Sequence, residues 1–139
     1  MAVASHLADK STYARLHQPT VHDRLAPLLE HGLVATCSVV DLEILYSSRT
    51  PREYEEVLAE RGGFERLDIE QSDWDRAIAV QRLLARSSRH RGAGIPDLLL
   101  AAVAERHQVT VLHYDQDFDH IAAATGQSVE WVVPPGSVP

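Results

Sequence analysis

The sequence predicts an α/β fold, a single domain with a mostly parallel central sheet and helices on both of its faces. Three observations predict it. Apolar, β-branched segments alternate with segments of helical spacing, which is typical of strand–helix–strand units around a parallel sheet. Hydrophobic residues make up 45% of the 139 residues, enough for one core. No repeat or linker divides the chain, so we expect one domain over residues 1–133 and a flexible tail over 134–139.

Five short segments, most of them apolar and β-branched, are predicted to be strands. The third alternates apolar with polar residues and is expected at an edge of the sheet. In chain order the five segments are residues 2–8, 33–37, 64–69, 109–114 and 129–133.

The segments between these strands have helical spacing, and several begin with residues that favour helix N-termini. Thr20, Thr50 and Ser72 are predicted N-caps, and Ser38 with Asp41 three positions later is typical of a capping box. In chain order the predicted helices span residues 11–17, 20–31, 38–48, 50–61, 73–89, 96–107 and 117–125.

The composition narrows the class of protein. The net charge of −7 is not typical of a nucleic-acid binder, but the acid excess falls to three if four carboxylates hold a divalent cation. Lys10 is the only lysine, and arginine, the predominant base, suits bidentate phosphate contacts. No apolar run approaches the roughly 18 residues of a membrane span, and no signal peptide is evident. Together with the single cysteine, Cys37, expected as a small buried residue, these features favour the cytoplasm.

Four acids occupy positions where a parallel sheet places its ligands. Asp9 and Asp115 follow predicted strands, and Asp97 lies in the first turn of a helix. Glu43 lies in a helix that begins at a strand's carboxyl end. Because ligands bind at the carboxyl ends of the strands in open α/β sheets, we expect these four side chains to meet there.

Each acid also has a purely structural explanation. Asp9 and Asp115 could cap helices, and the helix dipole could favour Asp97. Glu43 is harder to explain, because its helix is otherwise mostly apolar and a carboxylate there needs solvent or a positive partner.

The four acids together indicate a metal site. Carboxylates at ~4 Å repel by about 1 kcal/mol per pair even in water, so a cluster needs cations or protons. Hard oxygen ligands without Cys or paired His favour Mg²⁺ or Mn²⁺, as one or two ions. Such ions activate water and neutralise charge on a phosphodiester. The residues alone therefore predict metal-dependent phosphoryl-group chemistry.

The segment YDQDFDH adds Asp117 as a fifth acid beside Asp115. It is not a calcium loop, because His120 stands where that loop needs Gly and Gly126 where it needs Glu. Asp119 is expected in solvent, further into the helix. The eight histidines show no metal-ligand pairing and are expected at the surface or at polar edges.

The order of these motifs resembles a family. HLADKS, SVVDLEILYS, GIPDLLLAAVA and VLHYDQDFDHIA follow one another as in a PIN domain, specifically a VapC-type toxin of a bacterial toxin–antitoxin pair. The resemblance covers Leu7 to Trp131. It implies cleavage of RNA by water activated on Mg²⁺ or Mn²⁺, a homodimer and larger toxin–antitoxin assembly, and inhibition by a cognate antitoxin.

The resemblance also assigns residues. It implies that Asp9, Glu43, Asp97 and Asp115 are the catalytic acids and, with Asp117, the metal ligands. Ser11 matches a small hydroxyl residue that helps to order the site. Two positions depart from the common pattern of the family. Lys10 stands where Thr is common, and His113 stands where many relatives carry Thr or Ser.

The loop before Asp97 is basic. We expect Arg86, Arg89, His90 and Arg91 to form a rim that contacts RNA phosphates, the alternative being a solvated loop.

Other classes remain open at this point. A PIN-fold protein without activity could serve only as a binding partner. An aspartyl-nucleophile phosphatase could use Asp115 and Asp117, and a receiver-like signalling module could have a similar acidic pocket. Such phosphatases usually carry the acid pair on an early strand and need a lysine to balance the phosphate, and the only lysine here is Lys10. A receiver-like module needs a lysine at the end of a late strand, where this sequence has none.

Overall fold

The computed structural model describes residues 2–139, and its centre is a five-stranded sheet. The strands are β1 (His6–Ala8), β2 (Val34–Thr36), β3 (Glu65–Arg66), β4 (Thr110–His113) and β5 (Val129–Trp131). Their order is β3-β2-β1-β4-β5, and every pair is parallel. The predicted α/β class is confirmed, and β3 does lie at an edge.

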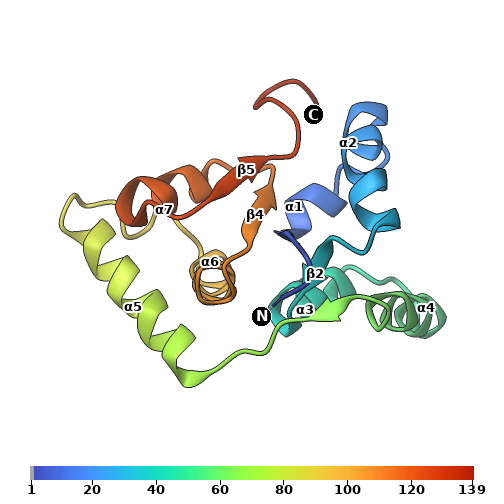
Figure 1. Ribbon diagram of the computed structural model, residues 1–139, viewed down its shortest axis with the longest axis horizontal. Helices are drawn as coiled ribbons and strands as arrows, with labels where there is room; N and C mark the ends of the chain where they lie inside the picture. Colours follow the sequence, from blue (N-terminus) through green and yellow to red (C-terminus); the bar gives the residue numbers. More distant parts are fainter. Residues whose placement is uncertain (1) are drawn as a thin grey trace.

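Seven helices in the described chain connect and cover these strands. They are α1 (Lys10–Tyr13), α2 (Pro19–Glu30), α3 (Ser38–Tyr46), α4 (Pro51–Arg61), α5 (Gln71–Ala85), α6 (Ile95–His107) and α7 (Asp117–Thr125). Figure 1 shows α5, α6 and α7 gathered beside β4 and β5, with α2 near α1 at the opposite side.

Alternate strand residues enter two separate cores, one on each face of the sheet. Leu7 and Val111 pack with α5, α6 and α7, whereas Ala8 and Leu112 pack with α2. This alternation follows from the two-residue period of a strand. Both faces are covered, which is why the strands are apolar on both sides.

The chain order of the strands creates the crevice that matters for function. From the central β1 the chain builds outward to β2 and β3, and then returns to place β4 on the other side of β1. The carboxyl ends of β1 and β4 therefore flank a topological switch point, the usual ligand position in such folds.

Two of the three predicted single-residue N-caps are wrong. Pro19 begins α2 after Gln18, so Thr20 is not its N-cap. Glu70, not Ser72, caps α5 and forms a reciprocal capping box with Asp73. The predicted Thr50 cap of α4 is confirmed, because its side chain accepts a hydrogen bond from the Glu53 N–H.

The predicted capping box of Ser38 and Asp41 is also wrong, since Cys37 is the N-cap of α3. Asp41 is instead buried, and its carboxylate accepts hydrogen bonds from the Arg61 Nε and the Thr36 hydroxyl at 2.9 and 2.7 Å. The Arg61 guanidinium lies over the Phe64 ring. A polar network therefore joins α3 to α4 and β2.

Several elements are shorter than predicted. The first strand begins only at His6, the third has two residues, and α5 ends at Ala85 rather than at residue 89. Strand pairing requires a neighbour at each register position, and β2 pairs with only Glu65 and Arg66 of the third segment.

The last six residues, expected to form a flexible tail, lie against the body in this structure. The Tyr114 hydroxyl donates to the Val138 carbonyl at 2.8 Å, and the Arg15 Nε donates to the Pro139 carbonyl at 3.0 Å. Among residues 2–139, no helix combines the length and apolar character that crossing a membrane requires.

Candidate metal centre

Asp9 begins the site at the carboxyl end of β1. Its N–H donates to the Leu112 carbonyl of β4 at 2.9 Å, and its Oδ2 accepts the Ser11 N–H at 3.0 Å. The Ser11 hydroxyl in turn accepts the Tyr114 N–H at 2.9 Å. Ser11 therefore ties the start of α1 to the end of β4, a structural role compatible with the ordering role expected for it.

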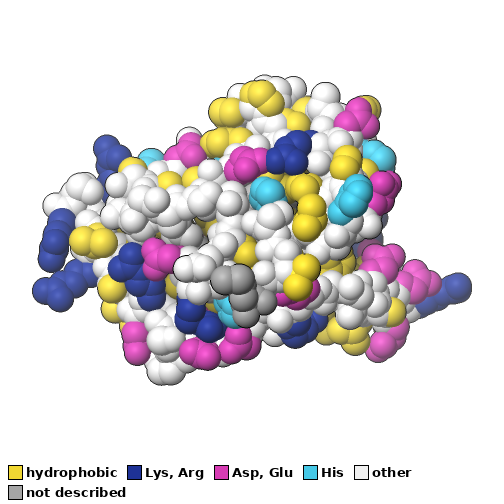
Figure 2. Space-filling model, viewed as in Figure 1, with side chains coloured by type: hydrophobic (Ala, Val, Ile, Leu, Met, Phe, Trp, Pro, Cys, Tyr) yellow, Lys and Arg dark blue, Asp and Glu magenta, His cyan; other side chains and the backbone are white. Residues whose placement is uncertain are grey.

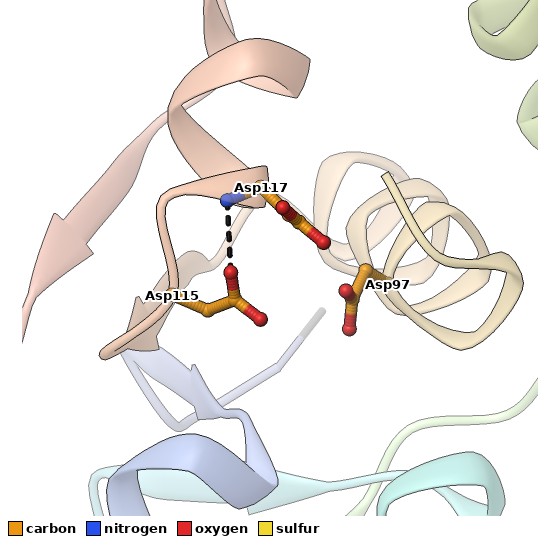
Figure 3. Close-up of side chains that lie close together, drawn as sticks. All are labelled: Asp97, Asp115 and Asp117. Atoms are coloured by element: carbon orange, nitrogen blue, oxygen red, sulfur yellow. Dashed lines mark hydrogen bonds between the residues drawn. The ribbon is translucent and has the colours of Figure 1, made fainter. Parts of the chain in front are cut away.

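Three aspartates converge across the crevice. Asp97 in the first turn of α6 points toward Asp115, after β4, and Asp117, at the start of α7 (Figure 3). One carboxylate oxygen from each lies within 4.8 Å of the others, close enough for one metal ion. The Asp117 N–H donates to Asp115 Oδ1 at 2.9 Å, and this hydrogen bond orients the Asp115 carboxylate.

Glu43 approaches the same cluster from α3. Its Oε2 lies 3.1 Å from the Lys10 ammonium, so the positive partner that an acid in this helix needs is Lys10. The sequence alone did not predict this contact. The one feature of the sequence that could have indicated it is the position of Lys10 directly after Asp9. Asp9 and Glu43 lie outside the tight group of three, yet their charges reach Asp97.

The acids perturb one another. Burial first, and then the charges of Asp9, Asp115, Glu43 and Asp117, raise the pKa of Asp97 to about 8. Burial and the Asp115 charge also raise the pKa of Asp117, while His120 and a hydrogen bond from Gly94 oppose the shift. Raised pKa values are expected where like charges share a site without a cation.

The residues fit a hard divalent cation. Oδ1 of Asp9 and Oε1 of Glu43 are buried and have no hydrogen-bond partner among the described residues. Asp9 is only 1% exposed, so water does not readily satisfy its oxygen. Five carboxylates with no thiolate are a donor set for Mg²⁺ or Mn²⁺.

The histidines were expected at the surface or at polar edges, and this prediction is wrong for His113. It is fully buried, with ring centroids of Phe118 and Trp131 each 4.9 Å away. Its Nδ1 accepts the Asp115 N–H at 3.2 Å. Burial lowers its pKa, which keeps the ring neutral and able to accept this bond.

The basic loop lies between α5 and α6. Arg86, Arg89, His90 and Arg91 are all exposed. Basic side chains, drawn in dark blue, project at the left end of Figure 2, the end where Figure 1 places this loop. Among the described residues these three arginines form no ion pair, so their charges are available to a ligand.

The PIN-domain model matches residues 13–124, and the chain therefore belongs to the PIN-domain family. Two relatives that carry the name ribonuclease VapC are similar along almost the whole chain. Ribonuclease VapC21 of Mycobacterium tuberculosis is 45% identical over 133 residues, covering 95% of this chain and 96% of that protein. Ribonuclease VapC51 of the same organism is 44% identical, with 96% of each chain covered. The resemblance to VapC-type proteins is thus confirmed.

Solved structures agree on the fold. DNA-bound VapBC from Salmonella typhimurium matches with a TM-score of 0.72 at 18% identity, covering 94% of this chain and 100% of that chain. VapBC-5 of Mycobacterium tuberculosis, a toxin–antitoxin member, matches with a TM-score of 0.57 at 25% identity, covering 91% and 97%. The phosphatase and receiver alternatives do not fit this family.

Proposed function

We propose that this chain is the toxin of a toxin–antitoxin pair, an endoribonuclease that hydrolyses RNA phosphodiester bonds with Mg²⁺ or Mn²⁺. The observation that carries the proposal is the convergence of Asp97, Asp115 and Asp117 next to the unpartnered buried oxygen of Asp9. The relatives named as ribonucleases support the reaction, and the VapBC complexes support an antitoxin partner.

The residues have distinct roles in this proposal. Asp9, Glu43, Asp97, Asp115 and Asp117 would hold one or two divalent cations between them, and the bound metal would supply Lewis acidity for attack of water on the phosphodiester. A new bond would form from the water oxygen to phosphorus as the water loses a proton, the bond from phosphorus to one ribose oxygen would break, and that oxygen would take up a proton. Asp97 must be ionised to bind the cation, so cation binding releases its proton.

Further partners belong to the same proposal. We place the protein in the cytoplasm, where RNA and an antitoxin meet it. We assign a homodimer interface to the apolar pocket between α5 and α6, where Trp74, Ile78 and Ile95 are 46%, 65% and 68% exposed. Light scattering of the purified chain would test this, and a monomeric mass at micromolar concentration would contradict it.

The nuclease proposal is tested with purified chain free of antitoxin, total bacterial RNA, and Mg²⁺ or Mn²⁺. Asp97→Asn should lower the cleavage rate at least ~100-fold, corresponding to about 2.7 kcal/mol of transition-state stabilisation. Asp23→Asn, an exposed acid on α2, is the matched control and should cleave like wild type. EDTA should abolish cleavage.

If wild type and Asp97→Asn behave alike with every RNA and metal, the catalytic proposal fails. The catalytically inactive binding partner then becomes the function to test. Sequencing the new RNA ends in a positive experiment identifies the substrate.

A further inference from the structure

Lys10 lies over the acidic cluster. It is the first residue of α1 and the only lysine in the sequence. Its ammonium is 3.1 Å from Glu43 Oε2. The ammonium is therefore paired with Glu43, although 55% of the Lys10 side chain remains exposed.

The acidic cluster has two unlike halves. In one half, Asp97, Asp115 and Asp117 bring carboxylate oxygens within 4.8 Å of one another. In the other half, Asp9 and Glu43 each keep one buried oxygen without a partner, and the ammonium lies on the second oxygen of Glu43. A carboxylate as buried as Asp9 indicates that a cation belongs on this side as well.

We propose that the Lys10 ammonium fills the place of a second divalent cation beside Asp9 and Glu43, so that the chain binds one divalent ion, between Asp97, Asp115 and Asp117. The inference rests on the proposed function only in that these five carboxylates form the metal site. One ammonium and one divalent ion bring three positive charges to five carboxylates. A tethered ammonium also repels a divalent ion that approaches Glu43.

The proposal gives Lys10 a role in the reaction. In two-metal nucleases, ions about 3.5–4 Å apart stabilise both the attacking and the leaving oxygen. Here the second positive charge belongs to the protein and is always present. Activity then depends on the concentration of one ion, and Lys10 supplies the charge opposite it.

The number of bound ions tests the proposal directly. Calorimetric titration of the purified chain with Mn²⁺ should give one ion per chain for wild type. Lys10→Met should give two ions, because Glu43 and Asp9 are released to bind one. The affinity of this second site should exceed any second-site binding in wild type by at least ~10-fold, which corresponds to about 1.4 kcal/mol.

Two variants serve as controls. Lys10→Arg keeps the positive charge and should bind one ion. Arg52→Met removes an exposed arginine of α4, whose side chain is 91% exposed, and should also bind one ion. Electron paramagnetic resonance gives an independent reading, since two neighbouring Mn²⁺ ions in Lys10→Met should show spin coupling that wild type lacks.

Two ions in wild type, or a single ion in Lys10→Met, would overturn the proposal. RNA cleavage by wild type is recorded in parallel. If wild type cleaves RNA with two bound ions, the inference about Lys10 is wrong and the proposed function stands. If wild type binds one ion and Lys10→Met binds two without either cleaving RNA, the proposed function fails and the assignment of Lys10 stands.

Discussion

At the residue scale, Asp97 is the carboxylate most strongly affected by its surroundings. It is partly buried and faces four other acids, so its pKa rises to about 8. An aspartate in the unfolded chain has a pKa of about 3.9. The metal-free folded chain therefore holds a proton that the unfolded chain has released throughout the range between these values.

This difference predicts how metal-free stability depends on pH. Because the folded state binds more protons, the contribution of Asp97 to stability falls as the pH rises from about 4 to about 8. Asp97→Asn should remove that part of the slope. At pH 8.5, without metal, it should raise Tm by about 4–8 °C, the shift that about 1–2 kcal/mol produces in a domain of this size.

Thermal unfolding of wild type and Asp97→Asn between pH 5 and 8.5 in EDTA checks the prediction. Asp23→Asn is again the control, because this acid is exposed on α2. If the plots of Tm against pH run parallel for wild type and Asp97→Asn, Asp97 is not the source of the pH dependence. Mg²⁺ should raise the Tm of wild type more than that of the variant.

At the element scale, the position of α3 depends on a buried ion pair. Arg61 of α4 is 4% exposed and donates to Asp41, while Arg66 of β3 lies 2.6 Å from the other Asp41 oxygen. Burial alone would raise the pKa of Asp41, but the hydrogen bonds from Arg61, Thr36 and Arg66 outweigh it and leave the pKa below its usual value. The network thus holds the helix that carries Glu43.

Asp41→Asn should destabilise the fold by about 3–5 kcal/mol, because it leaves the Arg61 charge buried without a counter-charge. Urea unfolding at pH 7 measures the loss. Glu56→Gln, which removes the partner of the exposed Arg52, should cost less than about 0.5 kcal/mol. Similar losses in both variants would contradict the assignment of Asp41 to the core.

The same pair predicts behaviour in acid. Because the folded pKa of Asp41 is depressed, its stabilising contribution is complete above the unfolded pKa and is lost as the pH falls through the folded pKa.

At the scale of the whole molecule, the acids of the site and the exposed arginines of the α5–α6 loop belong to different parts of the fold. The five acids gather at the switch point between β1 and β4, while the α5–α6 loop lies at one end of the molecule (Figure 1). This separation reconciles the net charge of −7 with an RNA substrate. Under the proposed function, the rim would attract the polyanionic RNA, and a bound cation would offset the charge of the acids.

Neutralising the rim with Arg86→Gln, Arg89→Gln and Arg91→Gln together should weaken RNA binding and reduce its dependence on salt. Each lost phosphate contact should lower the slope of log K against log salt by about 0.7 for single-stranded RNA. Binding is measured with the inactive Asp97→Asn background at several salt concentrations. An unchanged slope would exclude the rim, and Arg52→Gln should leave the slope as it is.

The sequence by itself determined the alternation of strands and helices, the parallel sheet, and the positions of Asp9, Asp97 and Asp115 near strand or helix ends. These features depend on local periodicity and on the rule that parallel strands end at one edge. Only the tertiary structure decided that Asp41 pairs with Arg61, that His113 is buried and that Lys10 lies on Glu43. Each of these contacts depends on which distant segment packs beside the residue, and the local sequence does not determine which segment that is.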